Sequence, residues 1–161
     1  MISKILREIE WVFFDVDGVM TDGKLYYGPN GEEYKVFNVK DGHGLKMIKD
    51  AGIKIAVISG RGNDALLQRL SEMKFDIVKI NRSDKGNVFN ELFEEYGNQI
   101  ENSIAIGDDL PDLEIFKRTK LGFAVANAVT EVKNQADVIL GTNGGEGAVR
   151  ELCEIILEVR N

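Results

Sequence analysis

Two aspartates stand two residues apart in Asp15-Val-Asp-Gly-Val, directly after the apolar run Trp11–Phe14. In an extended chain, residues i and i+2 point to the same side, so the side chains of Asp15 and Asp17 are expected to enter one pocket at a strand end. Two carboxylates this close repel each other, and a divalent cation or a shared proton relieves the repulsion and gives them separate roles. The pentapeptide alone is equally consistent with an acidic turn that has no chemistry.

A second acidic cluster follows another apolar run, in Ile106-Gly-Asp-Asp-Leu-Pro-Asp. Asp108, Asp109 and Asp112 are expected in a loop and the first turn of a helix, where grouped carboxylate oxygens suit a hard cation such as Mg²⁺. Helix capping explains Asp109 or Asp112 singly, but two adjacent aspartates at a strand end go beyond what a cap needs. The sequence therefore predicts a metal-binding group of carboxylates.

Two further segments have the residue types that bind an anion. In Ile58-Ser-Gly-Arg, the small Ser59 hydroxyl followed by Gly60 lets side-chain and backbone N–H groups approach an anion, and Arg61 adds a planar guanidinium. Lys85 is expected in the first turn of a helix, where its charge opposes the helix dipole unless an anion binds nearby. Taken singly, the serine and glycine are an ordinary turn and Lys85 is an exposed lysine.

These candidate residues follow short apolar runs, which are typical of buried strands. The runs are Trp11–Phe14, Ile53–Ile58, Ser103–Ile106 and Asp137–Leu140, with weaker ones at Ile77–Ile80 and Phe123–Val125. Helical patterns alternate with them at Gly44–Asp50, Asn63–Met73, Asp84–Tyr96, Leu110–Arg118, Val129–Asn134 and Gly147–Val159. Such alternation needs crossover connections, so we expect an α/β fold with a Rossmann-like, mostly parallel sheet and helices on both faces. The ligand site is then expected at the carboxyl ends of the strands.

One segment departs from this alternation. Lys24-Leu-Tyr-Tyr and Glu33-Tyr-Lys-Val-Phe flank the turn sequence Gly28-Pro-Asn-Gly, which predicts a protruding β-hairpin over residues 24–37. The sequence contains no longer insert that could form a lid, and no internal repeat. We therefore expect one domain over residues 1–161 without a separate cap domain.

Composition limits the partners and the compartment. The 161 residues contain 20 Lys and Arg against 27 Asp and Glu, and this net charge of −7 argues against a nucleic-acid or anionic-membrane surface. Cys153 is the single cysteine, and with no secretory signal over Met1–Glu10 it predicts a reducing cytoplasm. No apolar run approaches the roughly 20 residues that cross a bilayer. Cys153 and the lone His43 are interpreted as a core residue and a loop residue.

In their order along the chain, the four segments resemble the motifs of the haloacid dehalogenase-like phosphatases, and the resemblance covers essentially the whole sequence. It implies that Asp15 attacks phosphorus and becomes an aspartyl phosphate, while Asp17 protonates the leaving oxygen and later activates water. Ser59 and Lys85 would balance the charge of the transferring phosphoryl group. Mg²⁺ would be held by the carboxylates of Asp15 and Asp108 and by the backbone carbonyl of Asp17.

Further segments are similar to a narrower family, the 3-deoxy-D-manno-octulosonate 8-phosphate (KDO 8-phosphate) phosphatases of lipopolysaccharide precursor synthesis. They are Thr21-Asp-Gly-Lys-Leu-Tyr-Tyr, Gly31-Glu-Glu, Phe37-Asn-Val-Lys-Asp-Gly-His-Gly and Gly144-Gly-Glu-Gly-Ala-Val-Arg-Glu. The resemblance implies substrate contacts from Asp17, Asn38, Val39, Lys40, Asp41, Gly42, Lys46, Ser59, Gly60, Arg61, Arg69 and Lys85. Two departures bear on specificity. Ile80-Asn-Arg-Ser-Asp replaces the small-residue pair usual before the lysine motif, and Lys46 stands where arginine is common, which keeps the charge but loses a bidentate fork.

Three other functions compete with this interpretation. A phosphatase of nonulosonate (sialic-acid-type) 9-phosphates is a close relative, but it tends to carry an acidic residue where Arg61 stands. A two-component receiver domain is also a small acidic α/β protein that binds Mg²⁺, but its phosphorylated aspartate follows a middle strand rather than the first. A non-catalytic oligomerisation domain, like those attached to some cytidylyl-sugar synthetases, is disfavoured because Asp15, Asp17, Lys85 and Asp108 are all present.

An oligomer is expected because the sequence encodes no lid, whereas phosphoryl transfer benefits from the exclusion of bulk water. The hairpin, which is too small to be stable alone, carries Leu25, Tyr26, Tyr27, Tyr34, Val36 and Phe37. The family resemblance implies a homotetramer in which the hairpins form a shared barrel. Neighbouring subunits, through Gly144–Gly147 and the C-terminal helix, would close each active site. The alternative is a hairpin folded back on its own domain.

Overall fold

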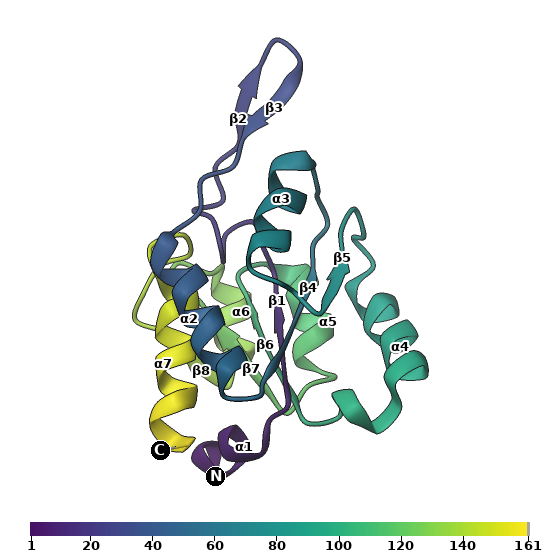
Figure 1. The fold of residues 1–161 in the computed structure, drawn as a ribbon, viewed down its shortest axis with the longest axis vertical. Helices are drawn as coiled ribbons and strands as arrows, with labels where there is room; N and C mark the ends of the chain where they lie inside the picture. Colours follow the sequence, from purple (N-terminus) through teal and green to yellow (C-terminus); the bar gives the residue numbers. More distant parts are fainter. Residues whose placement is uncertain (161) are drawn as a thin grey trace.

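The computed structural model describes residues 1–160, which form a six-stranded sheet and a separate two-stranded hairpin (Figure 1). The strand order in the sheet is β5-β4-β1-β6-β7-β8, and all its pairings are parallel. These strands are β1 (Trp11–Phe14), β4 (Lys54–Ile58), β5 (Ile77–Lys79), β6 (Ser103–Gly107), β7 (Leu121–Ala124) and β8 (Val138–Ile139). Each corresponds to one of the six predicted runs, so the α/β fold is confirmed.

The register of the central strands brings three chain segments to one edge of the sheet. Phe14 at the end of β1 lies opposite Val57 of β4 and Ile106 of β6. The residues that follow these strands therefore leave the sheet side by side. All the residues of β1 and β6 are buried, as expected for central strands covered on both faces.

Helices cover both sides of this sheet, with α2 against α7 on one side and α4 against α5 on the other (Figure 1). The helices are α1 (Ile2–Glu8), α2 (Val39–Asp50), α3 (Asp64–Glu72), α4 (Lys85–Tyr96), α5 (Leu113–Phe116), α6 (Thr130–Gln135) and α7 (Ala148–Arg160). Short 3₁₀ turns, η1 (Gly97–Ile100) and η2 (Leu110–Asp112), precede β6 and α5. None of the helices in the described part of the chain has the length and apolar character needed to span a membrane.

Helix α2 begins at Val39, five residues before the predicted start at Gly44. The Asn38 side chain caps it by accepting a hydrogen bond from the Lys40 N–H at 2.9 Å. Gly44 is a contact point for α7, because a Cβ there would lie 3.2 Å from both the Arg150 Cα and the Cys153 Cβ. The glycines of this segment indicated a loop in the sequence, but Gly44 allows close packing of two helices.

Two other elements differ from the prediction. Helix α1 was not predicted from the sequence, and its Leu6 is buried in the core while α1 packs on α7. The predicted helix over Leu110–Arg118 is instead the turn η2 followed by the short α5. Asp109 and Asp112 form a capping box around η2, so this segment is tied to the loop that precedes it.

The predicted hairpin is present and projects away from the body of the molecule (Figure 1). Its strands are β2 (Tyr26–Gly28) and β3 (Gly31–Tyr34), which are shorter than the predicted 24–37. Tyr27 and Tyr34 are among its exposed aromatic side chains. Phe37 does not belong to this exposed surface, because it packs against the core and its ring lies under the Arg69 guanidinium.

Candidate active site

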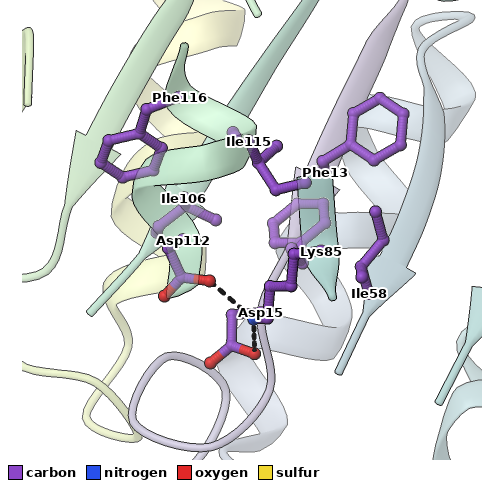
Figure 2. A pocket seen from close by; sticks show the side chains of 10 residues that line it. Phe13, Asp15, Ile58, Lys85, Ile106, Asp112, Ile115 and Phe116 are labelled. Atoms are coloured by element: carbon purple, nitrogen blue, oxygen red, sulfur yellow. Dashed lines mark hydrogen bonds and ion pairs between the residues drawn. The ribbon is translucent and has the colours of Figure 1, made fainter. Parts of the chain in front are cut away.

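Three buried ionic side chains meet at the carboxyl edge of the sheet. Lys85, the first residue of α4, donates hydrogen bonds from Nζ to Asp15 Oδ1 at 2.5 Å and to Asp112 Oδ1 at 2.6 Å. Figure 2 shows Lys85 bonded to both carboxylates. All three side chains are less than a tenth exposed. A lysine that the sequence alone could have placed in solvent therefore lies in the centre of the acidic group.

An apolar floor lies behind these charges. The side chains of Phe13, Ile58, Ile106, Ile115 and Phe116 line it, together with Asp15 and Lys85 (Figure 2). Desolvation in this environment, reinforced by the charge of Asp112 and opposed by Lys85, raises the pKa of Asp15 to about 7. Burial lowers the pKa of Lys85, but its two carboxylate partners outweigh that effect and the pKa is raised above its ordinary value.

Asp108 adds a third carboxylate to Asp15 and Asp112, and ligand atoms of the three lie within 4.8 Å of one another. Burial first, then the charges of Asp15 and Asp112, raise the pKa of Asp108 to about 8. Lys85 supplies one positive charge against three carboxylates, so full ionisation of the cluster would leave excess negative charge. A divalent cation would remove that excess, and carboxylate oxygens are the ligands that Mg²⁺ prefers.

Asp112 has a different position in this cluster from Asp15 and Asp108. Its Oδ1 accepts from Lys85, and its Oδ2 accepts from the backbone N–H groups of Asp108 at 2.9 Å and Asp109 at 3.2 Å. Both of its oxygens are thus occupied in holding Lys85 and the Asp108 loop in place. This arrangement favours Asp15 and Asp108 as the carboxylates that would touch a metal ion.

Gly18 allows the loop after β1 to approach Asp108. Its φ of +89° lies in the left-handed region, and a Cβ at this position would be 2.0 Å from Asp108 Oδ2. A side chain larger than hydrogen would therefore displace the carboxylate. The absence of a side chain at Gly18 therefore allows the Asp108 carboxylate to pack directly against the backbone of the Asp15-Val-Asp-Gly segment.

The four predicted motifs line one pocket of about 210 Å³. The residues around it are Asp15, Asp17, Ser59, Gly60, Arg61, Ser83, Lys85, Asp108, Asp109, Pro111 and Asp112. Ser59 is 1% exposed and is fixed by its own loop, since its Oγ donates to the Arg61 carbonyl at 2.8 Å and accepts from the Arg61 N–H at 3.3 Å. The structure therefore brings together the residues for which we expected catalytic and metal-binding roles.

Three hairpin residues contact side chains of this pocket, a position that the sequence did not predict for them. Lys35 donates from Nζ to Asp17 Oδ1 at 2.6 Å, while Arg61 donates to Glu32 Oε2 at 2.8 Å and to the Tyr27 hydroxyl at 3.2 Å. The hydrogen bond from Arg61 lowers the pKa of Glu32. In the sequence, the two-residue alternation of a β-strand could have divided the hairpin residues between two faces. It could not have shown which of these faces lies against the pocket.

The other predicted substrate residues lie away from the pocket of their own chain. Val39, Gly42, Lys46 and Arg69 line a second hollow of about 400 Å³ between α2 and α3. Lys40 borders a third hollow beside α7, Asn38 reaches the Gly145 carbonyl, and Asp41 is buried. Burial raises the pKa of Asp41 to about 6, and its Oδ1 accepts the Arg150 N–H at 2.9 Å. One chain therefore does not bring this group to Asp15.

Gly144 and Gly145, expected to help close a neighbouring site, are packed against the active-site loop of their own chain. A Cβ at Gly144 would lie 1.6 Å from the Gly18 carbonyl oxygen, and the Gly145 N–H donates to the Val19 carbonyl at 3.0 Å. Because these two glycines have no side chains, their backbone can pack closely against the Gly18–Val19 segment of the same chain.

Comparison with known proteins agrees with this fold. The model of the haloacid dehalogenase-like hydrolase family matches residues 66–152. The 3-deoxy-D-manno-octulosonate 8-phosphate phosphatase of Haemophilus influenzae is 41% identical over 155 residues, which cover 96% of this chain and 86% of the relative. The enzyme of the same name from Escherichia coli K12 is 37% identical over 151 residues, covering 94% and 80%. The chain belongs to the haloacid dehalogenase-like hydrolases.

Solved structures extend the similarity to the whole fold. The crystal structure of the Moraxella catarrhalis 3-deoxy-D-manno-octulosonate 8-phosphate phosphatase, in complex with a magnesium ion, a phosphate ion and KDO, matches with a TM-score of 0.93. It is 36% identical and the match covers 99% of this chain and 92% of that one. The cobalt-bound Haemophilus influenzae enzyme matches with a TM-score of 0.92 at 40% identity, covering 97% and 91%.

Proposed function

We propose that this protein is a Mg²⁺-dependent phosphatase that hydrolyses KDO 8-phosphate to KDO and phosphate through an aspartyl phosphate. The observation that carries the proposal is the buried contact of Asp15 with Lys85 beside the Asp108 carboxylate, in a pocket open to solvent. The names of the similar proteins support the choice of substrate.

In the first half-reaction, an Asp15 carboxylate oxygen forms a bond to phosphorus. The bond from phosphorus to the sugar oxygen breaks, its electron pair stays on that oxygen, and Asp17 supplies the proton. In the second half-reaction, Asp17 takes a proton from water as the water oxygen attacks phosphorus, and the electron pair of the Asp15–phosphorus bond returns to the carboxylate. Ser59 and Lys85, which line the pocket, would bind the phosphoryl oxygens.

Mg²⁺ would be held by the carboxylates of Asp15 and Asp108 and by the backbone carbonyl of Asp17. The ion, when bound, neutralises negative charge on the transferring phosphoryl group. Burial, together with the charge of Asp112, raises the pKa of Asp15 to about 7, and the positive charge of the ion would oppose this rise and favour an ionised nucleophile at neutral pH. Asp112 holds Lys85 and the Asp108 loop in place from behind.

Arg61 is the proposed specificity residue for the sugar acid. Its side chain is 44% exposed at the pocket rim, and its guanidinium donates hydrogen bonds to Glu32 and Tyr27. It would attract an anionic or hydroxyl-rich part of the substrate that is remote from phosphorus.

The remaining recognition residues would act in an assembly. We propose a homotetramer in which the hairpins pack together, since Tyr26, Tyr27, Tyr34 and Val36 are 40–66% exposed on an element that projects from the fold. In this assembly the surface with Lys46 and Arg69 would complete the pocket of another copy. Cytoplasmic localisation is part of the same proposal, because the substrate belongs to lipopolysaccharide precursor synthesis.

The test is phosphate release from a panel of sugar-acid phosphates by the purified protein, with Mg²⁺ or with EDTA. We expect KDO 8-phosphate to be the preferred substrate and EDTA to stop turnover. Preference for a nonulosonate 9-phosphate would instead assign the protein to that related activity. A stable phosphorylated protein without turnover would favour a receiver domain, and the absence of any phosphoryl transfer would favour an oligomerisation domain.

A further inference from the structure

The surroundings of Asp17 contain a closed ring of alternating charges at the pocket rim. Lys35 Nζ donates to Asp17 Oδ1 at 2.6 Å and lies 3.0 Å from Glu32 Oε1. Glu32 Oε2 accepts from Arg61 at 2.8 Å, and Arg61 Nε lies 3.8 Å from Asp17 Oδ2. Two hairpin residues are thus bound to the residue that moves the proton and to the proposed specificity residue.

Lys35 is unusual for a hairpin lysine. Its side chain is 3% exposed, whereas the neighbouring Tyr34 and Val36 are 66% and 58% exposed. Burial of an ammonium group is costly unless ionic partners compensate for the lost water. The ion pairs with Asp17 and Glu32 compensate the Lys35 ammonium for its lost hydration. These two carboxylates therefore determine where the Lys35 side chain lies.

We propose that Lys35 is a positioning residue that selects which oxygen of Asp17 transfers the proton, an inference that rests on the proposed role of Asp17. An ammonium group has three hydrogen-bond donors and no acceptor, so a proton on Asp17 cannot lie on Oδ1 toward Lys35. It lies on Oδ2, whose distance of 3.8 Å to Arg61 Nε is longer than a hydrogen bond.

This assignment gives each oxygen of Asp17 a separate task. When the phosphorus–oxygen bond to the sugar breaks, the electron pair stays on the sugar oxygen and Oδ2 gives that oxygen its proton. When water attacks the aspartyl phosphate, Oδ2 takes the proton of the water and the bonding pair returns to Asp15. Throughout both steps Oδ1 remains bound to Lys35, which fixes the rotation of the carboxylate.

The test compares two leaving groups in single turnovers with enzyme in excess. For Lys35→Met we expect the release of KDO from KDO 8-phosphate to slow by about 10–10²-fold, part of the worth of a general acid, while the KM changes less than about threefold. Release of 4-nitrophenolate from 4-nitrophenyl phosphate should stay within about threefold, because this stable anion leaves without a proton. Steady-state turnover of both substrates should fall, because Asp17 must still activate water.

Three further variants make the outcome specific. Lys35→Arg should restore most of the rate, since it keeps a donor cation at Oδ1. Lys24→Met is the matched control, because Lys24 is a hairpin-base lysine that is 74% exposed and pairs with Asp22, and it should behave like the wild type. Lys35→Gln tests the same point if the methionine variant does not fold, and should show the same dependence on the leaving group.

A double variant separates this inference from the proposed function. In an Asp17→Asn background, Lys35→Met should slow KDO release by less than about twofold, because Lys35 acts through Asp17. Wild-type single-turnover rates for Lys35→Met would overturn the inference, and so would equal slowing of KDO and 4-nitrophenolate release in single turnovers. It would also be overturned if the double variant were slowed by the full product of the Lys35→Met and Asp17→Asn effects. Failure of the proposed function would show differently, as a wild-type protein that releases no KDO or an Asp17→Asn variant with unchanged rates.

Discussion

At the carboxyl end of β1, Asp15 meets Lys85 of α4, and Lys85 also bonds Asp112 of η2; the two distances are 2.5 and 2.6 Å, in an apolar environment. Between α2 and α3, the cations Lys46 and Arg69 line a hollow of about 400 Å³ whose described lining contains none of the catalytic aspartates. The first region is complete within one chain, and its geometry follows from the ends of neighbouring parallel strands. The second carries charges that suit a sugar acid but does not reach the phosphorus site of its own chain.

Under the proposed function, this difference separates the residues that carry out phosphoryl transfer from those that recognise the substrate. Asp15, Ser59 and Lys85 are buried, and each makes at least one hydrogen bond at the pocket. Lys46 and Arg69 lie outside this pocket, and the hairpin projects from the fold with Tyr26, Tyr34 and Val36 exposed. Variants at the Asp15 cluster should therefore affect the turnover of every phosphate ester, whereas variants at the surface with Lys46 and Arg69 should affect mainly the sugar-acid phosphate. Only a defect of the second kind could be compensated by an intact surface on another subunit.

The largest effect is expected from Asp15→Asn, which removes the nucleophile. Turnover of KDO 8-phosphate and of 4-nitrophenyl phosphate should both fall by at least about 10⁴-fold, because no phosphoryl bond can form. Phosphate release and circular dichroism together check this prediction. Near wild-type phosphate release from a folded variant would refute the mechanism.

The next effect concerns Asp108 and Asp112, the two carboxylates that lie beside Asp15 in the acidic cluster. Asp108→Asn should raise the Mg²⁺ concentration needed for half-maximal activity by more than about 100-fold, because a direct ligand is lost. Asp112→Asn should raise it by about 10–100-fold, as expected of a residue that supports the ligands. Activity measured over a Mg²⁺ titration after EDTA treatment decides, and equal shifts for the two variants would contradict the assignment.

A smaller and selective effect is expected at the pocket rim. Arg61→Glu should lower the kcat/KM for KDO 8-phosphate by about 10–10²-fold and that for 4-nitrophenyl phosphate by less than about threefold, because repulsion acts only on the remote part of the substrate. Lys120→Glu, the same change of charge at an exposed residue outside the pocket, should leave both values unchanged. A uniform fall on both substrates would mean that Arg61 supports the phosphate site or the fold.

The smallest effect is on stability and follows from the raised pKa values of Asp15, about 7, and Asp108, about 8. From about pH 5 upward the unfolded chain has ionised these groups, whereas the folded metal-free protein still holds their protons and releases them only as the pH rises through their raised pKa values. The folded state therefore binds more protons, and its stability falls as the pH rises through this range. We expect the Tm in EDTA to be at least about 4 °C lower at pH 8 than at pH 5, which corresponds to roughly 1–2 kcal/mol for a chain of this size.

Magnesium and Asp108→Asn provide the controls for this measurement. Added Mg²⁺ should recover the Tm at pH 8, because it stabilises the ionised carboxylates, and the asparagine variant should show a weaker pH dependence in EDTA. A Tm in EDTA that is constant or rises from pH 5 to 8 would contradict the account of the buried charges.

The sequence was sufficient to predict the position of those site residues that directly follow a strand of the parallel sheet. Asp15, Ser59 and Asp108 follow β1, β4 and β6, and parallel strands in register deliver such residues to one edge. Glycine misled the prediction at Gly44, since close packing of α2 on α7 outweighs the low helix propensity of glycine.

The hairpin contacts could not be predicted for another reason. Lys35 and Glu32 acquire their roles only because the base of the hairpin folds over Asp17 and Arg61, which are 18 and 29 residues away along the chain. No local pattern specifies that approach. The same limit applies to Lys46 and Arg69, whose partners would come from another copy of the chain.

Mixing two defective variants tests the separation between chemistry and recognition most directly. Asp15→Asn lacks the nucleophile, and a Lys46→Ala, Arg69→Ala variant lacks the recognition surface, so each alone should turn over KDO 8-phosphate poorly at substrate concentrations below the wild-type KM. After subunit exchange, verified by native mass spectrometry, we expect the mixture to recover at least about a tenth of wild-type activity, because some pockets combine an intact Asp15 with an intact surface from another copy. Mixed oligomers without recovered activity, or a monomer with full wild-type activity, would contradict the account.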